Sequence, residues 1–288
     1  MGFREKVEEG EFVITSEIAP RKGHDAGSIL ETAGFLSDHV DAINVTDNQR
    51  ACVRASSLAA SKVLLDKGIE PIYQATTRDR NRIGIQSDLL GAMMLGIRNI
   101  LALTGDHPAG GDHPQAKPVY DIDSTQLLKL ITMMNEGTDM EGNPLDSPTD
   151  FFPGAAFNPG AEDRDVELLR ISRKMDAGAL FFQTQVVYDA DDYLDFMKEA
   201  PKGIRVLPGI VPLKSRRMAE FMNEKVPGVN VPKDLIAELD EGSDPLMTGL
   251  DQAARIIRAI KPHASGVHVM ALGAQQHVAI LLEKAGLR

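Results

Sequence analysis

The chain has 288 residues, of which 43% are hydrophobic and 5% aromatic, so it can build one large α/β barrel or two ordinary domains with an aliphatic core. Its formal net charge of -11 argues against a general nucleic-acid binder. The sequence contains no run of about 18 apolar residues, so no membrane span is predicted. The N-terminal segment lacks the apolar stretch of a secretory signal, and the single cysteine, Cys52, permits no intrachain disulfide; we therefore expect a cytoplasmic protein.

Short apolar runs alternate with longer helical patterns along the whole chain. In chain order, the predicted strands cover 12–18, 41–46, 69–76, 99–105, 151–157, 179–185, 204–211 and 266–272. The predicted helices cover 27–39, 52–67, 83–96, 124–136, 162–177, 189–200, 214–223, 232–260 and 274–286. Ser124 and Asp189 are expected to be N-caps, and Cys52 is expected at a helix start.

Eight strands, each followed by helix, predict a single (βα)8 TIM barrel spanning 1–288, because strands separated by helices pair in parallel. An open doubly wound sheet is the alternative, and the absence of any GxGxxG or GxxxxGK[ST] motif disfavours it. Long loops are expected at 106–123 and 137–150. The first directly follows a strand and is expected to be functional, whereas the second fits an insertion equally well.

Polar residues at the C-terminal ends of the predicted strands are the candidate site, because barrel enzymes place their chemistry there. These residues come from different strands and should converge: Glu17, Thr46, Asp47, Asn48, Gln74, Thr76, Asp106, Asn158, Gln183, Gln185 and Lys214.

Two of these positions carry a carboxyl group suited to catalysis. Glu17 lies within an apolar strand, where the charged form is disfavoured and a proton can be kept for general acid catalysis. Asp106 follows Gly105 at a strand end, where a carboxylate can stabilise a cationic transition state. A salt bridge at the barrel rim for Glu17, and an Asx-turn or helix cap for Asp106, are the structural alternatives.

Other side chains are less informative when they are considered alone. Gln183 and Gln185 share one face of a strand, and their amides could pair with the edge of a heterocycle such as a pterin. Lys174 near a helix C-terminus is often only a partner for the helix dipole. The histidines do not fall at metal-ligand spacings, so no metal site is predicted.

Several segments together resemble the methylenetetrahydrofolate reductase family. They are TSEIAP with Glu17, INVTDN with Thr46, LALTGDHP with Asp106, RKMDAGALFFQTQ with Lys174 and Gln185, and VLPGIVPL at 206–213. The match is colinear from about residue 10 to 285. The stretch from VTDNQRA through QATTRDRNRIGIQSDLLGA to GDHPQAKPVYDIDS is similar to the short, catalytic-domain-only reductases of acetogens and related anaerobes.

The resemblance implies reduction of 5,10-methylenetetrahydrofolate to 5-methyltetrahydrofolate by a flavin, FAD or alternatively FMN, at the barrel mouth. Glu17 matches the acid that protonates N10, Asp106 the carboxylate beside the flavin and the substrate cation, and Gln185 a pterin contact. Flavin-binding positions are matched by Thr46, Gln74, Thr104, Gly105, Asp106, Tyr120, Asp121, Ala156, Phe157 and Lys174. The resemblance also implies an oligomer, with NAD(P)H or an electron-transferring, cysteine-rich partner subunit as the electron source.

The chain departs from the well-known NADH-using members at five positions. This chain has Gln74 where those members have a His, Thr104 where they have an Arg, and Phe157 where they have a Tyr. It has Arg216 in place of a Phe and Ala274 in place of an Arg. The departures at Arg216 and Ala274 weaken the expected nicotinamide pocket, so the electron donor stays open. Two alternative functions also remain: a pterin-dependent methyltransferase, and a flavin-free folate reductase that uses NADH directly.

Overall fold

A computed structural model describes residues 1–287 of the chain. Eight parallel strands form one closed barrel in which each strand pairs with the next in chain order and β8 pairs with β1. The strands are β1 (Val13–Ile18), β2 (Ala42–Val45), β3 (Pro71–Thr76), β4 (Asn99–Leu103), β5 (Phe152–Phe157), β6 (Phe181–Val186), β7 (Val206–Ile210) and β8 (Gly266–Val269). The predicted (βα)8 barrel is confirmed, and the open sheet is excluded because neither β1 nor β8 is an edge strand.

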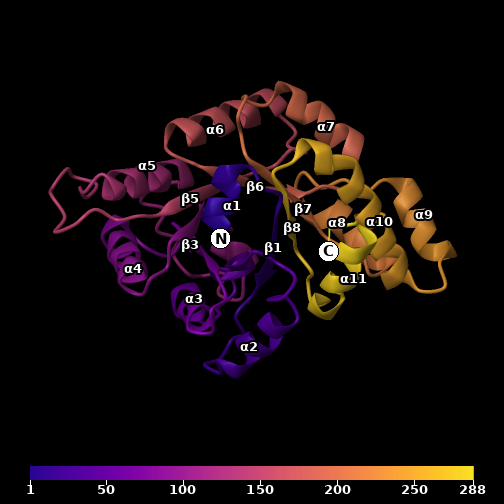
Figure 1. Ribbon diagram of the computed structural model, residues 1–288, viewed down its shortest axis with the longest axis horizontal. Coiled ribbons are helices and arrows are strands. Elements are labelled where there is room, and N and C mark those ends of the chain that lie inside the picture. Colours follow the sequence, from indigo (N-terminus) through magenta and orange to yellow (C-terminus); the bar gives the residue numbers. More distant parts are fainter. Residues whose placement is uncertain (288) are drawn as a thin grey trace.

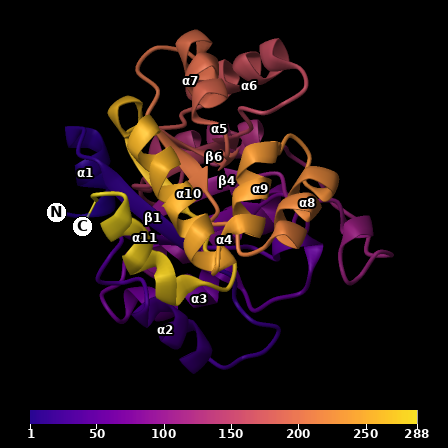
Figure 2. The same ribbon diagram turned by 90° about the vertical axis from the view of Figure 1, so that its right-hand side faces the viewer.

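Helices surround the barrel, as the ribbon in Figure 1 shows. Their bounds are α2 (Gly27–Gly34), α3 (Ser57–Leu65), α4 (Arg82–Met94), α5 (Ser124–Asn135), α6 (Arg164–Asp176), α7 (Ala190–Glu199), α8 (Arg216–Lys225), α9 (Lys233–Glu241), α10 (Pro245–Ile260) and α11 (Val278–Lys284). Short 3-10 turns add η1 (Gln49–Ala51), η2 (Pro108–Gly110), η3 (Lys261–His263) and η4 (Gln275–His277). The crossover between β7 and β8 carries three helices, α8, α9 and α10 (Figure 2).

Helix caps correct several predicted boundaries. Asp189 is an N-cap as expected, but α5 is capped by Asp123, whose carboxylate accepts the Gln126 N–H, and not by Ser124. The predicted helix at 232–260 is two helices, because the Asp244 side chain accepts two backbone N–H groups and starts α10 afresh. Cys52 lies five residues before α3, in extended backbone after η1, so it is not at a helix start.

An N-terminal helix that the sequence did not predict, α1 (Phe3–Glu9), closes one end of the barrel. The Phe3 ring is fully buried and makes edge contacts with Phe152 and Phe181, at centroid distances of 6.1 and 5.3 Å. Both partners lie at the beginnings of their strands, so α1 covers the N-terminal end of the barrel. The C-terminal ends of the strands are therefore the end at which a ligand can enter.

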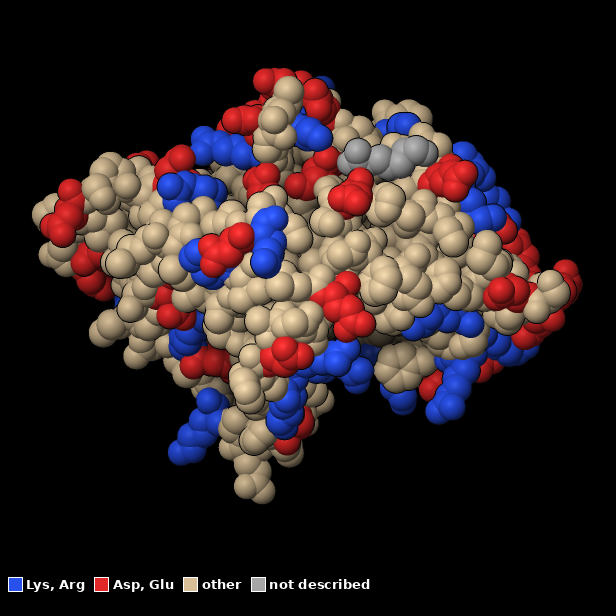
Figure 3. Space-filling model, turned by 60° about the horizontal axis from the view of Figure 1, so that its bottom comes forward, with Lys and Arg blue, Asp and Glu red and all other residues tan. Residues whose placement is uncertain are grey.

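The surface seen in Figure 3 mixes acidic and basic side chains, so the net charge of -11 is not gathered into one patch on this face. Two large groups of buried apolar residues lie between strands and helices. A third group, which includes Phe3, fills the N-terminal end of the barrel. Within residues 1–287, no helix has the length and apolar character needed to cross a membrane.

Candidate active site

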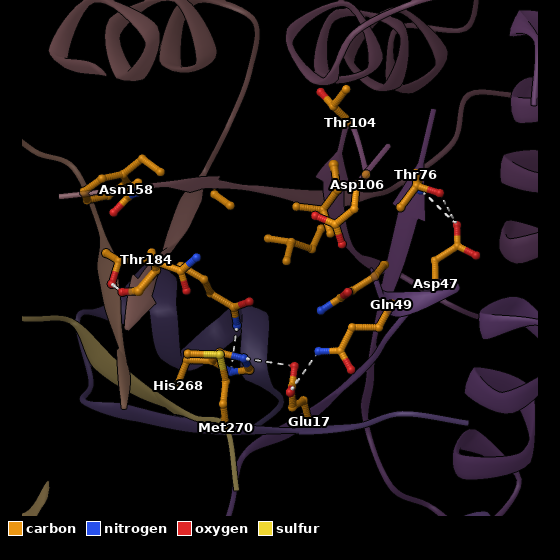
Figure 4. A pocket seen from close by; sticks show the side chains of 18 of the residues that line it. Glu17, Asp47, Gln49, Thr76, Thr104, Asp106, Asn158, Thr184, His268 and Met270 are labelled. Carbon is orange, nitrogen blue, oxygen red and sulfur yellow. Dashed lines mark hydrogen bonds and ion pairs between the residues drawn. The ribbon is translucent and has the colours of Figure 1, made fainter. Parts of the chain in front are cut away.

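The C-terminal mouth of the barrel holds a cavity of about 460 Å³ (Figure 4). This volume lies in the range of small-molecule sites. Residues from six strands, from the segments that follow β2, β3, β4, β5 and β8, and from α6 line it. They are Glu17, Asp47, Gln49, Gln74, Thr76, Arg78, Leu101, Leu103, Thr104, Gly105, Asp106, Ala156, Phe157, Asn158, Glu167, Gln183, Thr184, Gln185, His268 and Met270.

Glu17 is buried on β1, with 7% of the residue exposed, and it faces the cavity. Its carboxyl group has a nitrogen neighbour on each side: Gln49 Nε2 is 3.5 Å from Oε1, and His268 Nε2 is 3.9 Å from Oε2 (Figure 4). No lysine or arginine forms an ion pair with Glu17 in the described part of the chain. A rim salt bridge with a lysine or arginine is therefore not what this geometry shows, and the basic group beside Glu17 is the His268 imidazole.

A layer of buried polar side chains lies below Glu17. Asn44 and Gln183 exchange two hydrogen bonds across the barrel, with Nδ2–Oε1 at 2.7 Å and Nε2–Oδ1 at 3.1 Å. Thr15 Oγ1 lies 2.9 Å from His268 Nδ1 and 3.3 Å from Gln183 Nε2. The parallel register explains this meeting, because Thr15 pairs with His268 on one side of β1 and Glu17 pairs with Asn44 on the other. These groups satisfy one another where water is excluded.

Asp106 is exposed at the rim of the cavity, and its position depends on Gly105. Gly105 has a φ of +87°, and a Cβ there would approach the side chains of Thr76 and Arg78 at 3.1 and 3.3 Å. Asp106 Oδ2 accepts the backbone N–H of Arg50 at 3.1 Å, which ties this carboxylate to the loop after β2. The contact crosses between two loops, so the Asx-turn alternative does not describe it.

Arg78 was not among the predicted site residues, yet its side chain is only 2% exposed and lines the cavity. Its guanidinium binds both carboxylate oxygens of Asp79, at 2.9 and 2.7 Å, and donates to the carbonyls of Asn48 and Asp106, each at 3.3 Å. The hydrogen bond from Arg78 holds the pKa of Asp79 below its usual value. Arg78 thereby joins the loops that follow β2, β3 and β4.

Five further predicted cofactor residues lie at the cavity, namely Gln74, Thr104, Gly105, Ala156 and Phe157. Phe157 is buried and stacks on Phe196, with ring centroids 5.7 Å apart. Gln185 also lines the cavity, although the ladder between β6 and β7 is irregular between Gln183 and Val186. Gln183 and Gln185 both line the cavity, but so does Thr184 between them, so the simple alternation expected from the sequence does not describe this segment.

Four other predicted cofactor residues are not part of the cavity wall. Thr46 is buried beside it, and its hydroxyl has no hydrogen-bond partner in the described structure. Lys174 Nζ donates to the Ala156 carbonyl at 2.6 Å, and burial lowers the pKa of its ammonium group. Tyr120 donates to the Gly105 carbonyl at 3.3 Å, and Asp121 binds Arg82 at 2.9 Å. Lys174 and Tyr120 therefore touch the backbone of cavity residues.

Two more cavity residues, Gln49 and His268, were missed by the sequence reasoning. His268 lies in the apolar run GVHVM, so it carries the same signal that drew attention to Glu17, a polar residue inside a buried strand. Gln49 directly follows the predicted strand-end group, but its partner on β1 cannot be read from the sequence. Within residues 1–287, no cluster of three or more His, Cys, Asp or Glu could hold a metal ion.

These features first define a class: a (βα)8 barrel with carboxyl and amide groups gathered at its C-terminal mouth, the arrangement used by barrel enzymes. The model of one family, methylenetetrahydrofolate reductase, matches residues 2–286. The chain therefore belongs to the methylenetetrahydrofolate reductase family.

Curated relatives carry the same family name. Methylenetetrahydrofolate reductase 2 of Schizosaccharomyces pombe is 23% identical over 281 residues, which cover 91% of this chain and 39% of that protein. The 5,10-methylenetetrahydrofolate reductase of Escherichia coli is 30% identical over 139 residues, 46% of this chain and 42% of that protein. The alignments thus span about two fifths of these relatives.

Solved structures share the fold at low sequence identity. A Clostridium thermocellum protein that binds two copies of 5-methyl-5,6,7,8-tetrahydrofolic acid superposes with a TM-score of 0.68 at 15% identity, covering 99% of this chain and 98% of that one. A 2,3-dimethylmalate lyase superposes with a TM-score of 0.55 at 11% identity, covering 98% and 84%. At these identities the likeness concerns the barrel alone.

Proposed function

We propose that this chain reduces 5,10-methylenetetrahydrofolate to 5-methyltetrahydrofolate, with a flavin bound at the barrel mouth. The observation that carries the proposal is the meeting of Glu17, Asp106 and Gln185 around one cavity, in a chain of this family. Each of these side chains matches a family position with a distinct role. The folate bound by the Clostridium thermocellum barrel agrees with a folate as substrate.

The residues at the mouth fit a flavin ring. Leu101, Leu103 and Phe157 offer an apolar surface for a flat heterocycle, and the Gln74 amide can pair with its polar edge. The buried Thr46 hydroxyl is without a partner in the described residues, so a hydrogen-bonding group is available beside the cavity. When bound, the flavin supplies hydride transfer; FAD is proposed in preference to FMN on the family resemblance.

The protein's own side chains supply acid catalysis and electrostatic stabilisation. Glu17 in its protonated form donates its proton to N10 of the substrate, which opens the five-membered ring and leaves an iminium carbon able to accept a hydride. Asp106 places a carboxylate near that cation and stabilises it. Gln185 offers an amide donor and acceptor to the pterin edge, which orients the substrate.

The test is a visible absorbance spectrum of the purified protein, followed by anaerobic assay. The protein should show the absorbance of an oxidised flavin after gel filtration, and denaturation should release the flavin for identification as FAD or FMN. With a reduced dye as donor, 5,10-methylenetetrahydrofolate should be converted to 5-methyltetrahydrofolate. A colourless protein that binds neither flavin yet reduces the folate with NADH would support direct hydride transfer from nicotinamide and overturn the flavin proposal.

A pterin-dependent methyltransferase predicts a different result in the same assay. Such a protein would be colourless, would leave 5,10-methylenetetrahydrofolate unchanged, and would consume 5-methyltetrahydrofolate only with a methyl acceptor. The conversion of the methylene to the methyl folate therefore separates the two functions.

A further inference from the structure

We infer that His268 and Gln49 are the positioning residues of Glu17, with His268 held as the neutral tautomer that carries its proton on Nε2. This inference rests on the proposed function, in which Glu17 is the acid. It adds two residues, one on β8 and one in the loop after β2, that hold the acid from opposite sides. Neither is expected to touch the reacting atoms.

The first argument is the position of the two nitrogens. Gln49 Nε2 lies 3.5 Å from one carboxyl oxygen of Glu17, and His268 Nε2 lies 3.9 Å from the other (Figure 4). His268 is 3% exposed, so little water competes for its ring. These distances are longer than ordinary hydrogen bonds, but contacts in free enzymes often shorten when the substrate closes the site. With a nitrogen beside each oxygen, the carboxyl group is flanked on both sides where it faces the cavity.

The second argument concerns the His268 tautomer. The Nδ1 atom lies 2.9 Å from Thr15 Oγ1 and 3.4 Å from Gln183 Nε2. Gln183 donates one amide hydrogen to Asn44 Oδ1 at 3.1 Å, which leaves its second hydrogen directed toward the Thr15 and His268 pair. The Gln183 amide nitrogen can only donate. The Thr15 hydroxyl accepts from Gln183 and has two acceptors within reach of its own hydrogen, His268 Nδ1 at 2.9 Å and the Val267 carbonyl at 3.4 Å. Donation over the shorter distance makes Nδ1 the acceptor and leaves the proton on Nε2. The polar layer below the site therefore presents an N–H group to Glu17.

The third argument is that Gln49 is held by the same contacts that place Asp106. Gln49 begins η1, between Asn48 and Arg50, which have φ values of 46° and 59°. Arg78 binds the Asn48 carbonyl, and Asp106 binds the Arg50 N–H. Left-handed residues are strained unless surrounding contacts hold them. The loop after β2 therefore contacts both carboxyl groups, Glu17 through Gln49 and Asp106 through the Arg50 N–H.

Two substitutions at His268 separate positioning from packing. In His268→Asn the amide oxygen can stand near the Nδ1 site and accept as Nδ1 does, so the contacts with the polar layer can persist while Glu17 loses its neighbour. In His268→Gln the amide nitrogen reaches the Nε2 site. We expect His268→Asn to lower kcat of dye-driven folate reduction by about 10²-fold with KM little changed, because a misplaced group costs about that much, and His268→Gln to restore most of the rate. Equal losses in both variants, or none in either, would overturn the inference.

Gln49→Leu tests the contact on the other side of the Glu17 carboxyl group, because leucine keeps the approximate volume of glutamine but donates no hydrogen bond. We expect kcat to fall by about tenfold, a small part of the factor that general acid catalysis supplies. A wild-type kcat in this variant would remove Gln49 from the inference.

The Glu17→Gln background distinguishes failure of this inference from failure of the proposed function. If Glu17→Gln alone is fully active, the proposed acid is wrong. If Glu17→Gln is slow, His268→Asn should cause no further loss in it, because both changes remove one function. An additive further loss would show that His268 acts on something other than Glu17.

A measurement on the unmodified protein keeps the inference testable even if a variant does not fold. The 15N chemical shifts of the seven histidines distinguish a protonated ring nitrogen from a bare one, and the signals absent from a His268 variant, or assigned through the backbone, identify this ring. Nε2–H with bare Nδ1 is expected at neutral pH. A proton on Nδ1 alone, or on both nitrogens, would overturn the assignment.

Discussion

At the scale of single residues, Glu17 illustrates why a polar side chain in a buried strand is informative. A carboxyl group is placed there only if neighbouring groups compensate its lost hydration. Its neighbours in the structure are an imidazole and an amide, and no guanidinium or ammonium group pairs with it in residues 1–287. This environment is the one from which we propose that Glu17 acts as the acid.

Glu17→Gln keeps the shape of the side chain but cannot supply a proton. We expect the variant to fold, to retain flavin and to be reduced by a dye, while folate reduction slows by at least about 100-fold, the lower range of general acid catalysis. Asp106→Asn should slow the same step less, because it weakens cation stabilisation without removing the acid. Stopped-flow measurement of the two half-reactions checks both expectations.

The informative comparison in that experiment is between the half-reactions. If Glu17→Gln reduces the folate at a near-normal rate but unfolds at a lower temperature, the residue is structural and the acid lies elsewhere. A loss of flavin in Asp106→Asn would instead place that carboxylate mainly in cofactor binding.

Arg78 shows what a sequence cannot reveal at this scale. The segment TTRDRN predicts a charged turn after β3. It does not predict that its first arginine, Arg78, is buried against the carbonyl groups of two other loops. That contact depends on how three loops fold over the mouth. The sequence did not predict the role of His268 for a similar reason, because its contact with Glu17 requires β8 to pair with β1.

The pairing of Arg78 with Asp79 gives a pH-dependent prediction. The pKa of Asp79 is lowered in the folded state, so the pair stabilises the protein fully above the usual Asp pKa of about 3.9, and this stabilisation is lost as the pH falls through the lowered value. Because the Asp79 side chain is 41% exposed, the expected loss in Asp79→Asn is only about 1 kcal/mol at neutral pH. Urea midpoints of both proteins should differ at about pH 7, and the difference should shrink as the pH falls below the usual Asp pKa. A constant difference would show that charge is not involved.

At the scale of elements, the mouth is organised by two loops that cross. The loop after β2 and the loop after β4 meet where Gly111 passes Ala51, and a Cβ on Gly111 would lie 1.9 Å from the Ala51 carbonyl oxygen. The crossing lies next to the contact between Arg50 and Asp106. Close backbone packing therefore supports the position of the catalytic carboxylate proposed here.

Gly111→Ala should force these loops apart. We expect a loss of about 1–3 kcal/mol of stability from the steric conflict, together with slower folate reduction as Asp106 moves. Gly110→Ala is the matched control, because a Cβ there meets nothing within 4 Å, and its stability should stay within about 0.5 kcal/mol of wild type. Urea unfolding and a dye-linked assay measure the two effects. Equal behaviour of the two variants would mean that the crossing does not position the site.

Secondary structure was predictable where a short apolar run decided it, and wrong at some helix ends and where distant contacts decided it. All eight strands were found, since each is a short apolar run bounded by turns. The predicted helix boundaries were wrong where an aspartate side chain caps the helix, as Asp123 does for α5 and Asp244 for α10. The helix α1 was missed because it is short and mostly charged, and it is held through Phe3, whose partners are more than a hundred residues away.

At the scale of the whole molecule, closure of one barrel end by α1 leaves one mouth at which the proposed flavin, folate and electron donor would meet. The two departures noted for the nicotinamide pocket can now be placed relative to that mouth. Arg216 on α8 is bound to Glu220 and Asp240, at 2.7 and 2.6 Å, and Ala274 is buried with 4% exposure. Neither lines the cavity, so neither offers it an aromatic ring or a free cation.

We therefore predict that the isolated chain oxidises NADH weakly or not at all, while reduced dyes support folate reduction. The reason is that a nicotinamide must stack within reach of the flavin, and the side chains that would hold it in NADH-using relatives are replaced here by an engaged arginine and a small buried alanine. Electrons would then come from another donor, such as a cysteine-rich partner subunit. Anaerobic stopped-flow mixing with NADH and, separately, NADPH measures the rate of flavin reduction. Reduction at about 10 per second or faster, a rate typical of enzyme turnover, would show that the chain carries a working nicotinamide site without these two groups.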